Sequence, residues 1–480
     1  MELDKDLQAR QEARCLAKKA FEAQQKLCRM NQQQLDAIVE AVASAFQAAA
    51  EELAQMAVEE TGFGNIKDKT TKNIFASKTV LNAIRPMKTI GILREDPEEK
   101  LWEVGVPMGV IAAIVPSTNP TSTVCYKAMI ALKSGNTIVF SPHPKAIRCT
   151  LKAAGIVARA AEQAGAPAGS VGCLTIPSMA GCQELMSEQH TRLILATGGP
   201  AMVRAAYSSG KPAIGVGAGN GPAYIHRSAD VEKALACIVK SKTFDNGTVC
   251  ASEQSIIVEK DMEQQVRKAA AAMGCYFMST EEAGALAKLL FKPNGTLNPE
   301  IVGKNAVYLA QMAGFKVPEF TKVLIAREQE AGPTRPYSME KLCPVLAFFV
   351  MDHEDAVLEK AIEVLTHEGS GHTFALHAED MEVVRKFALQ IPVSRFLVNT
   401  PAALGGIGAT TGLFPALTLG CGAVGGSSSS NNISPLDLIN IRRVAWGQDN
   451  APDCRCKTTV THFDDSLVEL LTARILERLQ

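Results

Sequence analysis

Between residues 109 and 197, short apolar segments alternate with amphipathic segments, an order that few folds accommodate. The clearest apolar run, Gly109–Val115, is almost continuous and ends at Pro116, which is typical of a strand buried on both faces. Because short apolar strands separated by amphipathic helices form parallel units, the sequence predicts an α/β fold with a doubly wound parallel sheet. Further strands are expected at 137–140, 172–176 and 192–197, and helices at 128–133 and 150–165.

The regions on either side of this alternation have patterns of their own. Residues 7–60 carry apolar side chains at helical spacing and are expected to form two helices. After residue 250 the alternation resumes, with a strand expected at 255–258 and a helix at 262–273. A second α/β domain is therefore expected to begin near residue 245.

Composition narrows the class of protein. Lys and Arg number 49 and Asp and Glu number 50, so the net charge of −1 gives no electrostatic reason to expect binding to nucleic acid or to an anionic membrane. Prolines and glycines interrupt the uncharged stretch 396–436, so buried strands and turns are expected there instead of a membrane helix. The charged N-terminal segment and thirteen irregularly spaced cysteines argue against secretion and a disulfide framework, and a cytoplasmic location is expected.

Two loops carry candidate catalytic residues. Cys250 follows a turn that contains glycine and precedes a predicted strand, so its thiolate could attack an electrophilic carbon; a buried structural cysteine is the alternative. Asn119 follows the strand that ends at Pro116 and could donate its side-chain N–H to an oxyanion. The alternative for Asn119 is an Asx turn before Pro120.

Two glycine-rich segments are candidates for phosphate binding. Thr197 and Gly198 lie in a strand-to-helix turn, where small residues allow a pyrophosphate to approach the helix N-terminus. Residues 215–222 are also rich in glycine, and they form either a phosphate loop or a tight turn between domains.

Together these motifs resemble those of the aldehyde dehydrogenase superfamily, and especially its CoA-acylating branch, over residues 10–447. The resemblance is carried by PSTNPTS at 116–122, FSPHPKA at 140–146, ATGGP at 196–200, GVGAGNGP at 215–222, KTFDNGTVCASEQS at 242–255, EKLCPVL at 340–346, EGSGHT at 368–373 and LTLGCGAVGG at 417–426. It implies a Rossmann-type cofactor domain, an α/β catalytic domain and a protruding hairpin through which family members oligomerise. The corresponding ranges are 1–244 for the N-terminal helices and cofactor domain, 245–434 for the catalytic domain, 435–447 for a return segment or oligomerisation region, and 448–480 for a linker and C-terminal helix.

The resemblance also implies a role for each matching residue. Cys250 would form a thiohemiacetal with an aldehyde and then a thioester, while Asn119 and the backbone N–H of Cys250 would form the oxyanion hole. NAD would be the cofactor and CoA a co-substrate, although the adenosine loop leaves the choice between NAD and NADP open. The cofactor-binding residues would be Thr197 and Gly198 near the pyrophosphate, Glu340 on the nicotinamide ribose, and Ser141 and His143 near the adenosine ribose.

One departure from the hydrolytic members of the superfamily concerns the reaction. Those enzymes begin the segment matching 215–222 with a glutamate that activates water, whereas Gly215 and Val216 occupy this region. A thioester without such a base persists until a thiol takes the acyl group. The expected reaction converts an aldehyde, CoA and NAD⁺ to acyl-CoA and NADH, with acetaldehyde as the leading substrate and propionaldehyde or sulfoacetaldehyde as alternatives. A hydrolytic dehydrogenase and a non-catalytic microcompartment scaffold are the competing hypotheses.

Several other residues allow more than one interpretation. His372 could assist the CoA thiol, line the acyl pocket or be a structural histidine, and a sulfonate would require a cation such as Arg335 or Arg395. No metal site is expected, because Cys454 and Cys456 lack the further ligands of a zinc site.

The C-terminal segment differs from the rest of the chain. Residues 448–453 have the composition of a linker, and Ser466 and Glu469 have the spacing of a capping box at the start of an amphipathic helix. Such a tail resembles the helices that target enzymes into bacterial microcompartments, where its partner would be a shell protein. Packing on its own domain or on a neighbouring subunit is the alternative.

Overall fold

The computed structural model describes residues 4–447 together with Arg474 and Leu476. The chain forms two compact units. The larger one contains residues 4–91 and 105–441, and the smaller one contains 92–104 and the described residues from 442 onward. The predicted linker and amphipathic helix of the C-terminal segment lie outside the described residues.

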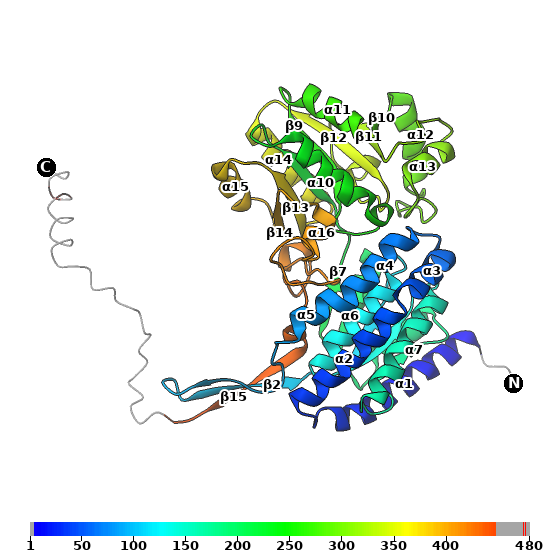
Figure 1. The fold of residues 1–480 in the computed structure, drawn as a ribbon, viewed down its shortest axis with the longest axis vertical. Coiled ribbons are helices and arrows are strands. Elements are labelled where there is room, and N and C mark those ends of the chain that lie inside the picture. Colours follow the sequence, from blue (N-terminus) through cyan, green and yellow to red (C-terminus); the bar gives the residue numbers. More distant parts are fainter. Residues whose placement is uncertain (1–3, 448–473, 475, 477–480) are drawn as a thin grey trace. The chain divides into compact units, whose positions relative to one another are not determined.

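A five-stranded parallel sheet organises the N-terminal half of the larger unit, which is coloured from blue to green in Figure 1. Its strand order is β5-β4-β3-β6-β7. Its strands are β3 (Val110–Ile114), β4 (Thr137–Ser141), β5 (Val171–Cys173), β6 (Thr191–Thr197) and β7 (Ala213–Val216). The strand order reverses between β3 and β6, which is the topological switch point of a doubly wound sheet. The predicted parallel sheet is confirmed, although β5 ends at Cys173 and the prediction extended to residue 176.

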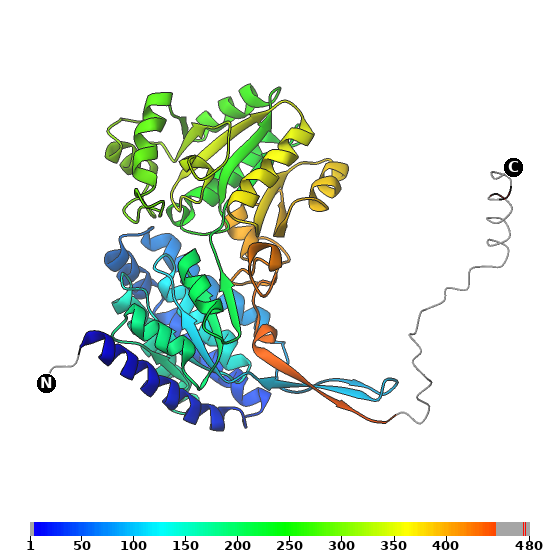
Figure 2. The same ribbon diagram turned by 180° about the vertical axis from the view of Figure 1, so that it is seen from behind.

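Helices cover both faces of this sheet because the side chains of its central strand alternate. Ile111 and Ala113 pack into a core with the helices α2, α6 and α7, whereas Ala112 and Ile114 pack with α1 and α8, which Figure 2 shows from behind. The helices are α1 (Lys5–Leu27), α2 (Gln32–Ala48), α3 (Ala50–Thr61), α4 (Ile66–Ile74), α5 (Val80–Ile84), α6 (Pro120–Lys133), α7 (Ile147–Gln163), α8 (Met179–Ser187) and α9 (Pro200–Tyr207).

The N-terminal helices number three, so the prediction of two helices over residues 7–60 is wrong. Helix α1 ends at Leu27, and Asn31 caps the start of α2 and forms a capping box with Gln34. A second break at Ala49 separates α2 from α3 without a side-chain cap. No proline or glycine marks either break, which explains why apolar periodicity alone overlooked one of them.

A seven-stranded parallel sheet organises the second half of the larger unit, with the order β10-β11-β12-β9-β8-β13-β14. Its strands are β8 (Gly221–Ile225), β9 (Glu253–Glu259), β10 (Cys275–Phe277), β11 (Val323–Arg327), β12 (Val345–Met351), β13 (Gly371–His377) and β14 (Val393–Val398). The sheet already includes β8, so its first strand precedes the boundary expected at residue 245. Its helices are α10 (Val231–Thr243), α11 (Glu263–Ala272), α12 (Thr280–Leu290), α13 (Ala306–Met312), α14 (Glu354–His367), α15 (Met381–Ala388) and α16 (Ala402–Gly406).

Helix α6 is buried along its whole length and fixes the loop that precedes it. All of its residues, including Lys127 and Lys133, are buried. The Nζ of Lys127 donates to the carbonyls of Ile114 and Leu195, at 2.8 and 2.9 Å, near the ends of β3 and β6. The helix is therefore held against the carboxyl edge of the sheet, with Asn119 at its N-cap position.

The smaller unit is organised by a three-stranded sheet with the order β1-β2-β15. Its strands are β1 (Gly91–Asp96), β2 (Leu101–Pro107) and β15 (Ile439–Ala445). The rings of Trp102 and Trp446 meet edge to face at 5.0 Å, and the backbone N–H of Trp446 donates to the carbonyl of Lys100. Strand β15 lies in the range 435–447 expected for the oligomerisation region, and that role stays a prediction.

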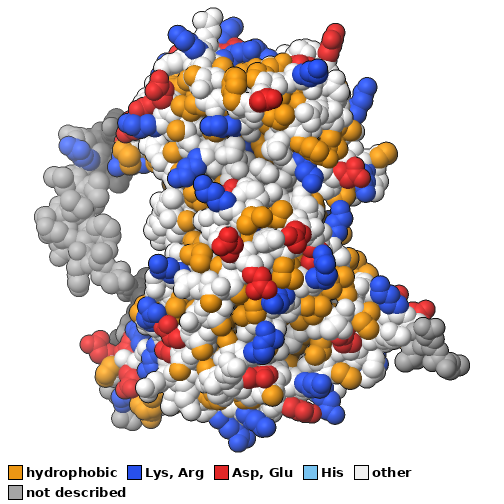
Figure 3. All heavy atoms as spheres, turned by 45° about the vertical axis from the view of Figure 1, so that its right-hand side comes forward, with side chains coloured by type: hydrophobic (Ala, Val, Ile, Leu, Met, Phe, Trp, Pro, Cys, Tyr) orange, Lys and Arg blue, Asp and Glu red, His pale blue; other side chains and the backbone are white. Residues whose placement is uncertain are grey.

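The surface of the protein carries both signs of charge. On the face seen in Figure 3, Lys and Arg side chains are interspersed with Asp and Glu, in agreement with the nearly balanced totals of 49 and 50. Across the described part of the chain, no helix combines the length and apolar character needed to cross a membrane.

Candidate active site

Four of the expected cofactor residues and Asn119 follow three adjacent strands of the first sheet, whereas Glu340 precedes β12 of the second sheet. Ser141 ends β4, Thr197 ends β6, and Asn119 lies in the loop after the intervening strand β3. Parallel strands end at one edge, so this edge at the switch point brings the three loops together. The backbone N–H of Val115 donates to the carbonyl of Ser141 at 3.1 Å, which joins two of these loops directly.

The turn after β6 fits a phosphate group. The hydroxyl of Thr197 is buried and has no hydrogen-bond partner within the described ranges, so its O–H is a free donor at this edge. Gly199 is the N-cap of α9, and a Cβ built on it meets no atom within 4 Å. A free hydroxyl beside an open helix N-terminus provides polar contacts for a pyrophosphate oxygen.

The two residues expected near the adenosine ribose, Ser141 and His143, differ in exposure. Ser141 is buried with 4% of its surface exposed, whereas His143 is exposed and its Nδ1 accepts a hydrogen bond from the backbone N–H of Lys145 at 3.1 Å. Of the two, His143 is therefore the side chain with open surface for a ligand.

Cys250 lies after a strained turn. The glycine in its sequence indicates a turn, but not the positive φ angles of the two residues before it. The short helix Phe244–Gly247 contains two non-glycine residues with positive φ, Asp245 at 48° and Asn246 at 52°. Asp and Asn are among the few side chains that adopt this region readily. The turn leads to Cys250, which is partly buried, and then to β9 in the second sheet.

A glycine brings Glu340 and His372 close to Cys250. A Cβ on Gly219 would lie 2.0 Å from the carbonyl oxygen of Cys250 and 3.3 Å from the Cε1 atom of His372, so only glycine fits. The backbone N–H of Gly219 donates to Oε1 of Glu340 at 2.9 Å. Glu368 in turn accepts from the backbone N–H of Glu340 at 2.7 Å, so two carboxylates meet at this side of the site.

The electrostatics keep the resting thiol protonated. Burial raises the pKa of Cys250 to about 12, and the negative charge of Glu340 acts in the same direction. Burial, reinforced by Glu368, also raises the pKa of Glu340 to about 8. Near neutral pH, both the thiol and this carboxyl group are therefore predominantly protonated in the free protein.

Asn119 is held by a lysine that sequence reasoning missed. The Nζ of Lys72, on α4, donates to Oδ1 of Asn119 at 2.6 Å, and it also donates to the hydroxyl of Thr248 at 3.0 Å. Thr248 lies two residues before Cys250, so Lys72 joins the asparagine loop to the cysteine loop. Because lysines on an amphipathic helix usually face solvent, no pattern in the sequence indicates that this lysine is buried.

His372 is fully buried and neutral. Burial lowers its pKa to about 3, and the charge of Arg395 adds to the effect. Its Nδ1 lies 2.7 Å from the hydroxyl of Thr373, and its Nε2 has no partner among the described residues. The ring is therefore available as a neutral hydrogen-bonding group and not as a cation.

The two candidate arginines for an anionic substrate have other partners. Arg335 is exposed and paired with Glu330. Arg395 is 2% exposed, and its terminal nitrogens donate to backbone carbonyls, including that of Gly420 at 2.6 Å. Its Nε has no partner in the part of the chain that the structure describes.

The region without a glutamate has no room for one. A Cβ built on Gly215 would lie 2.7 Å from Cγ1 of Val203 and 2.9 Å from the ring of Tyr207. The hydroxyl of Tyr207 also accepts from the backbone N–H of Gly215 at 2.9 Å, which keeps the ring in place. At residue 215, which is the position tested by this geometry, a carboxylate that activates water would displace Val203 or Tyr207.

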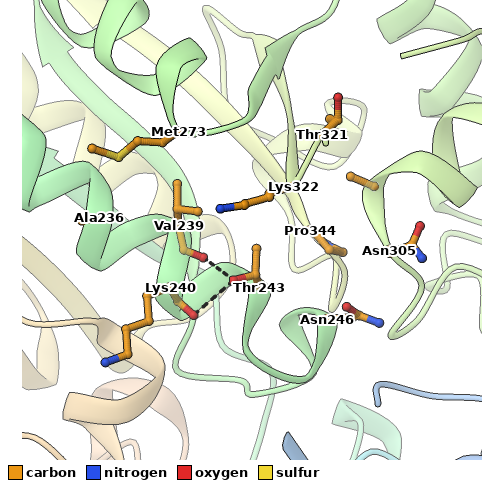
Figure 4. Close-up of a pocket in the computed structure, with 11 residues that line it drawn as sticks. Ala236, Val239, Lys240, Thr243, Asn246, Met273, Asn305, Thr321, Lys322 and Pro344 are labelled. Carbon is orange, nitrogen blue, oxygen red and sulfur yellow. Dashed lines mark hydrogen bonds between the residues drawn. The ribbon is translucent and has the colours of Figure 1, made fainter. Parts of the chain in front are cut away.

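A separate pocket of about 690 Å³ lies beside α10, and none of the seven predicted site residues lines it (Figure 4). One lining residue, Asn246, belongs to the cysteine loop, and its amide donates to the carbonyl of Gly303 at 2.8 Å. The pocket is lined by Ala236, Val239, Lys240, Thr243, Asn246, Met273, Asn305, Ala306, Thr321, Lys322 and Pro344. Separately, no group of three or more His, Cys, Asp or Glu within the described ranges is placed to hold a metal ion.

Comparisons with known proteins give a consistent family. The model of the aldehyde dehydrogenase family matches residues 6–275. The bifunctional aldehyde-alcohol dehydrogenase AdhE of Escherichia coli K12 is 45% identical over 445 residues, which are 92% of this chain and 50% of that protein. The chain thus spans about half the length of the curated relatives that it matches first.

Two solved structures resemble the whole fold. An acetylating aldehyde dehydrogenase from Geobacillus thermoglucosidasius has a TM-score of 0.92 and 48% identity, over 94% of this chain and all of that one. A propionaldehyde dehydrogenase from the fucose utilisation bacterial microcompartment of Clostridium phytofermentans has a TM-score of 0.82 and 30% identity, over 90% and 96% of the two chains.

The coupling between Glu340 and Cys250 predicts a distinctive pH dependence of thiol alkylation. In the free protein, the rate at Cys250 should rise by less than tenfold per pH unit from pH 7 to 9, since the thiolate is the nucleophile and the ionisation of Glu340 near pH 8 opposes its formation. In Glu340→Gln the rate should match the wild type near pH 7, where Glu340 is protonated, and exceed it increasingly above pH 8, where the wild-type carboxylate is charged.

The measurement is iodoacetamide labelling of the Cys250 peptide, followed by mass spectrometry. The exposed Cys15 serves as an internal control, because it lies on α1, which packs on the first sheet, whereas Glu340 precedes β12 of the second sheet. Its rate should be equal in both proteins. Equal Cys250 rates in both proteins at pH 9 would contradict the proposed coupling.

The close approach of Gly219 to Cys250 predicts the effect of a single methyl group. Gly219→Ala should lower the melting temperature and change the alkylation rate at Cys250, because the new Cβ would lie 2.0 Å from the carbonyl oxygen of Cys250. Gly217→Ala, in the same loop, is the matched control, since a Cβ there meets no atom within 4 Å. If the two variants behave alike in thermal melting and labelling, this packing argument is wrong.

Proposed function

Because the chain belongs to the aldehyde dehydrogenase family, as its sequence motifs predict, we propose that it is an NAD-dependent, CoA-acylating aldehyde dehydrogenase. The reaction converts acetaldehyde, CoA and NAD⁺ to acetyl-CoA, NADH and a proton. The observation that carries this proposal is the packing at Gly215, where Val203 and Tyr207 leave no space for a carboxylate that activates water. Without that base, an acyl group on Cys250 survives long enough for a thiol to accept it.

The first half of the reaction uses the two loops that Lys72 joins. The Cys250 sulfur, as its thiolate, forms a bond to the aldehyde carbon, and the carbonyl oxygen becomes an oxyanion. The side-chain N–H of Asn119 and the backbone N–H of Cys250 donate to that oxyanion and stabilise it. NAD, when bound, would supply the hydride acceptor, and a thioester would then remain on Cys250.

The second half transfers the acyl group to CoA. The CoA sulfur attacks the thioester carbon, the same donors hold the oxyanion, and the Cys250 sulfur leaves. We assign His372 as a hydrogen-bond acceptor for the incoming thiol, since its unpartnered Nε2 presents a lone pair when Nδ1–H donates to Thr373. With its low pKa, His372 accepts a hydrogen bond in this role without holding the proton.

The cofactor sites that we propose rest on the first sheet and on Glu340. Thr197 and Gly198 would hold the pyrophosphate at the N-terminus of α9, and His143 and Ser141 would hold the adenosine ribose. Glu340 holds the nicotinamide ribose. Its carboxylate, which the backbone N–H of Gly219 contacts in the free protein, is suited to accept hydrogen bonds from ribose hydroxyls.

Among substrates, acetaldehyde is preferred over sulfoacetaldehyde. A sulfonate needs a cation with free donors, whereas Arg335 pairs with Glu330 on the surface and Arg395 donates to backbone carbonyls. Propionaldehyde differs from acetaldehyde by one methylene group, for which a hydrophobic pocket discriminates weakly, by a factor of about 10 to 200. Rates on the three aldehydes distinguish these cases, and a marked preference for sulfoacetaldehyde would refute the assignment.

The experiment that tests the proposed function is NADH formation from acetaldehyde and NAD⁺, with and without CoA. We expect NADH formation to depend strictly on CoA, with acetyl-CoA as the product and no free acetate. Cys250→Ala should abolish the activity, whereas Cys237→Ala, a change at a partly buried cysteine of α10, should not. Equal rates without CoA and formation of acetate would indicate a hydrolytic enzyme. No NADH in either assay would indicate another aldehyde substrate or the non-catalytic scaffold.

For the C-terminal segment we propose targeting into a bacterial microcompartment, with a shell protein as the partner. The support is its sequence, a linker followed by an apolar stripe, and the similarity of the chain to a propionaldehyde dehydrogenase from such a compartment. Deletion of 460–480 should leave catalysis unchanged and prevent encapsulation when the protein is co-expressed with a shell. Leu471→Asp, on the apolar stripe, should have the same effect, and Arg474→Ala is the control; encapsulation of the truncated enzyme would refute the proposal.

A further inference from the structure

One face of helix α4 carries three buried polar side chains. Lys69, Lys72 and Asn73 are 3%, 3% and 0% exposed. Their spacing of three and four residues places them on the same side of the helix. Burial of two ammonium groups on one helix face is costly unless each is fully hydrogen-bonded, so their partners indicate what the face is built to hold.

The first set of partners is the loop that contains Asn119. Lys69 donates to the carbonyl of Thr118 at 2.8 Å, Lys72 donates to Oδ1 of Asn119 at 2.6 Å, and the side chain of Asn73 accepts from the hydroxyl of Thr121 at 2.8 Å. Three residues of α4 therefore contact three residues of a four-residue stretch. Helix α4 therefore binds this loop through a backbone carbonyl and through two side chains.

The contact at Asn119 determines which way the amide faces. An ammonium group can only donate, so the atom beside Lys72 must be the amide oxygen, and the NH₂ group must point away. One N–H of Asn119 reaches the hydroxyl of Thr118 at 3.2 Å, and the other remains for an oxyanion. The positive charge at the oxygen also polarises the amide, which makes its N–H groups stronger donors.

The second set of partners is the loop that contains Cys250. Oδ2 of Asp245 accepts from Lys69 at 2.9 Å and from Lys72 at 2.5 Å, and the hydroxyl of Thr248 also contacts Lys72. The carboxylate is fully buried and packs directly against Gly64. Only a glycine allows this approach, because a Cβ on residue 64 would lie 1.8 Å from Oδ1 of Asp245. The same ammonium group of Lys72 therefore touches the loops of both oxyanion donors.

We propose that Lys72 is the positioning residue of the oxyanion hole: it orients and polarises the amide of Asn119 and holds this amide in register with the backbone N–H of Cys250. Lys69 and Asp245 support it by joining the two loops. This inference rests on the proposed function, because it assigns the oxyanion role to Asn119 and Cys250.

The test uses acyl transfer from 4-nitrophenyl acetate to Cys250, with no aldehyde, NAD or CoA present. The Cys250 sulfur bonds to the acetyl carbon, the ester C–O bond breaks, 4-nitrophenolate leaves, and the thiol proton passes to water. Because this step forms an oxyanion, the single-turnover burst rate reports the hole directly. Lys72→Met should slow the burst about 10²- to 10³-fold, the effect of losing one oxyanion donor.

Lys69→Met is the matched control, since Lys69 shares the Asp245 contact but does not touch Asn119. Both variants should melt at lower temperature than the wild type, whereas Lys69→Met should retain far more of the burst rate. Alkylation of Cys250 by iodoacetamide forms no oxyanion, so Lys72→Met should leave that rate nearly unchanged. Lys72→Gln, which keeps an uncharged N–H donor, should restore part of the burst rate and replaces Lys72→Met if the latter does not fold.

A double variant separates positioning from general damage. In an Asn119→Ala background, Lys72→Met should cause little further loss of burst rate, because it acts through the amide that is already absent. Additive losses, equal losses in the Lys69 and Lys72 variants, or a burst rate unaffected by Asn119→Ala would overturn the inference. If the wild type shows the burst but oxidises no aldehyde, the proposed function fails while the assignment of Lys72 is still decided by these variants.

Discussion

The buried carboxylate of Asp245, bound by Lys69 and Lys72, is the interaction on which the arrangement of the site depends. It joins helix α4 to the loop that leads into β9 of the second sheet. Although burial alone would raise it, Lys72 and Lys69 hold the pKa of Asp245 below its ordinary value, so the carboxylate stays charged. Removing one partner of such a buried pair typically costs about 3 to 5 kcal/mol, because it leaves a charge without compensation.

Around this interaction, the site combines rigidly held hydrogen-bond donors with a cysteine thiol that is protonated in the free protein. Helix α6 is buried throughout and presents Asn119 at its N-cap, so the amide is fixed by packing as well as by Lys72. On the other side, burial and Glu340 keep the thiol of Cys250 protonated in the free protein. A protonated thiol is a poor nucleophile, which protects the cysteine from indiscriminate alkylation and oxidation when no substrate is bound.

The alternating pattern in the sequence was enough to predict the parallel sheets, because strands such as β3 are buried on both faces and contain only apolar residues. The same pattern could not fix where one sheet ends and the next begins, since β8 follows β7 almost directly but pairs with β9 and β13. For the site, the motifs pointed to Cys250, Asn119 and Glu340, and the geometry then supplied Gly219 as the contact between two of them. Lys72 and Asp245 could not be found in this way, because charged residues are usually exposed and their partnership spans 173 positions of the chain.

That separation along the chain has a consequence for how the protein is made. During synthesis, α4 and α6 emerge long before Asp245, and the two lysines of α4 then have no carboxylate to share. The first sheet can assemble, but the ammonium groups of Lys69 and Lys72 have no carboxylate to balance their charge until the loop that contains Asp245 has been synthesised. The contacts that join the loops of Asn119 and Cys250 are therefore completed by one carboxylate, and only in chains that have continued past residue 245.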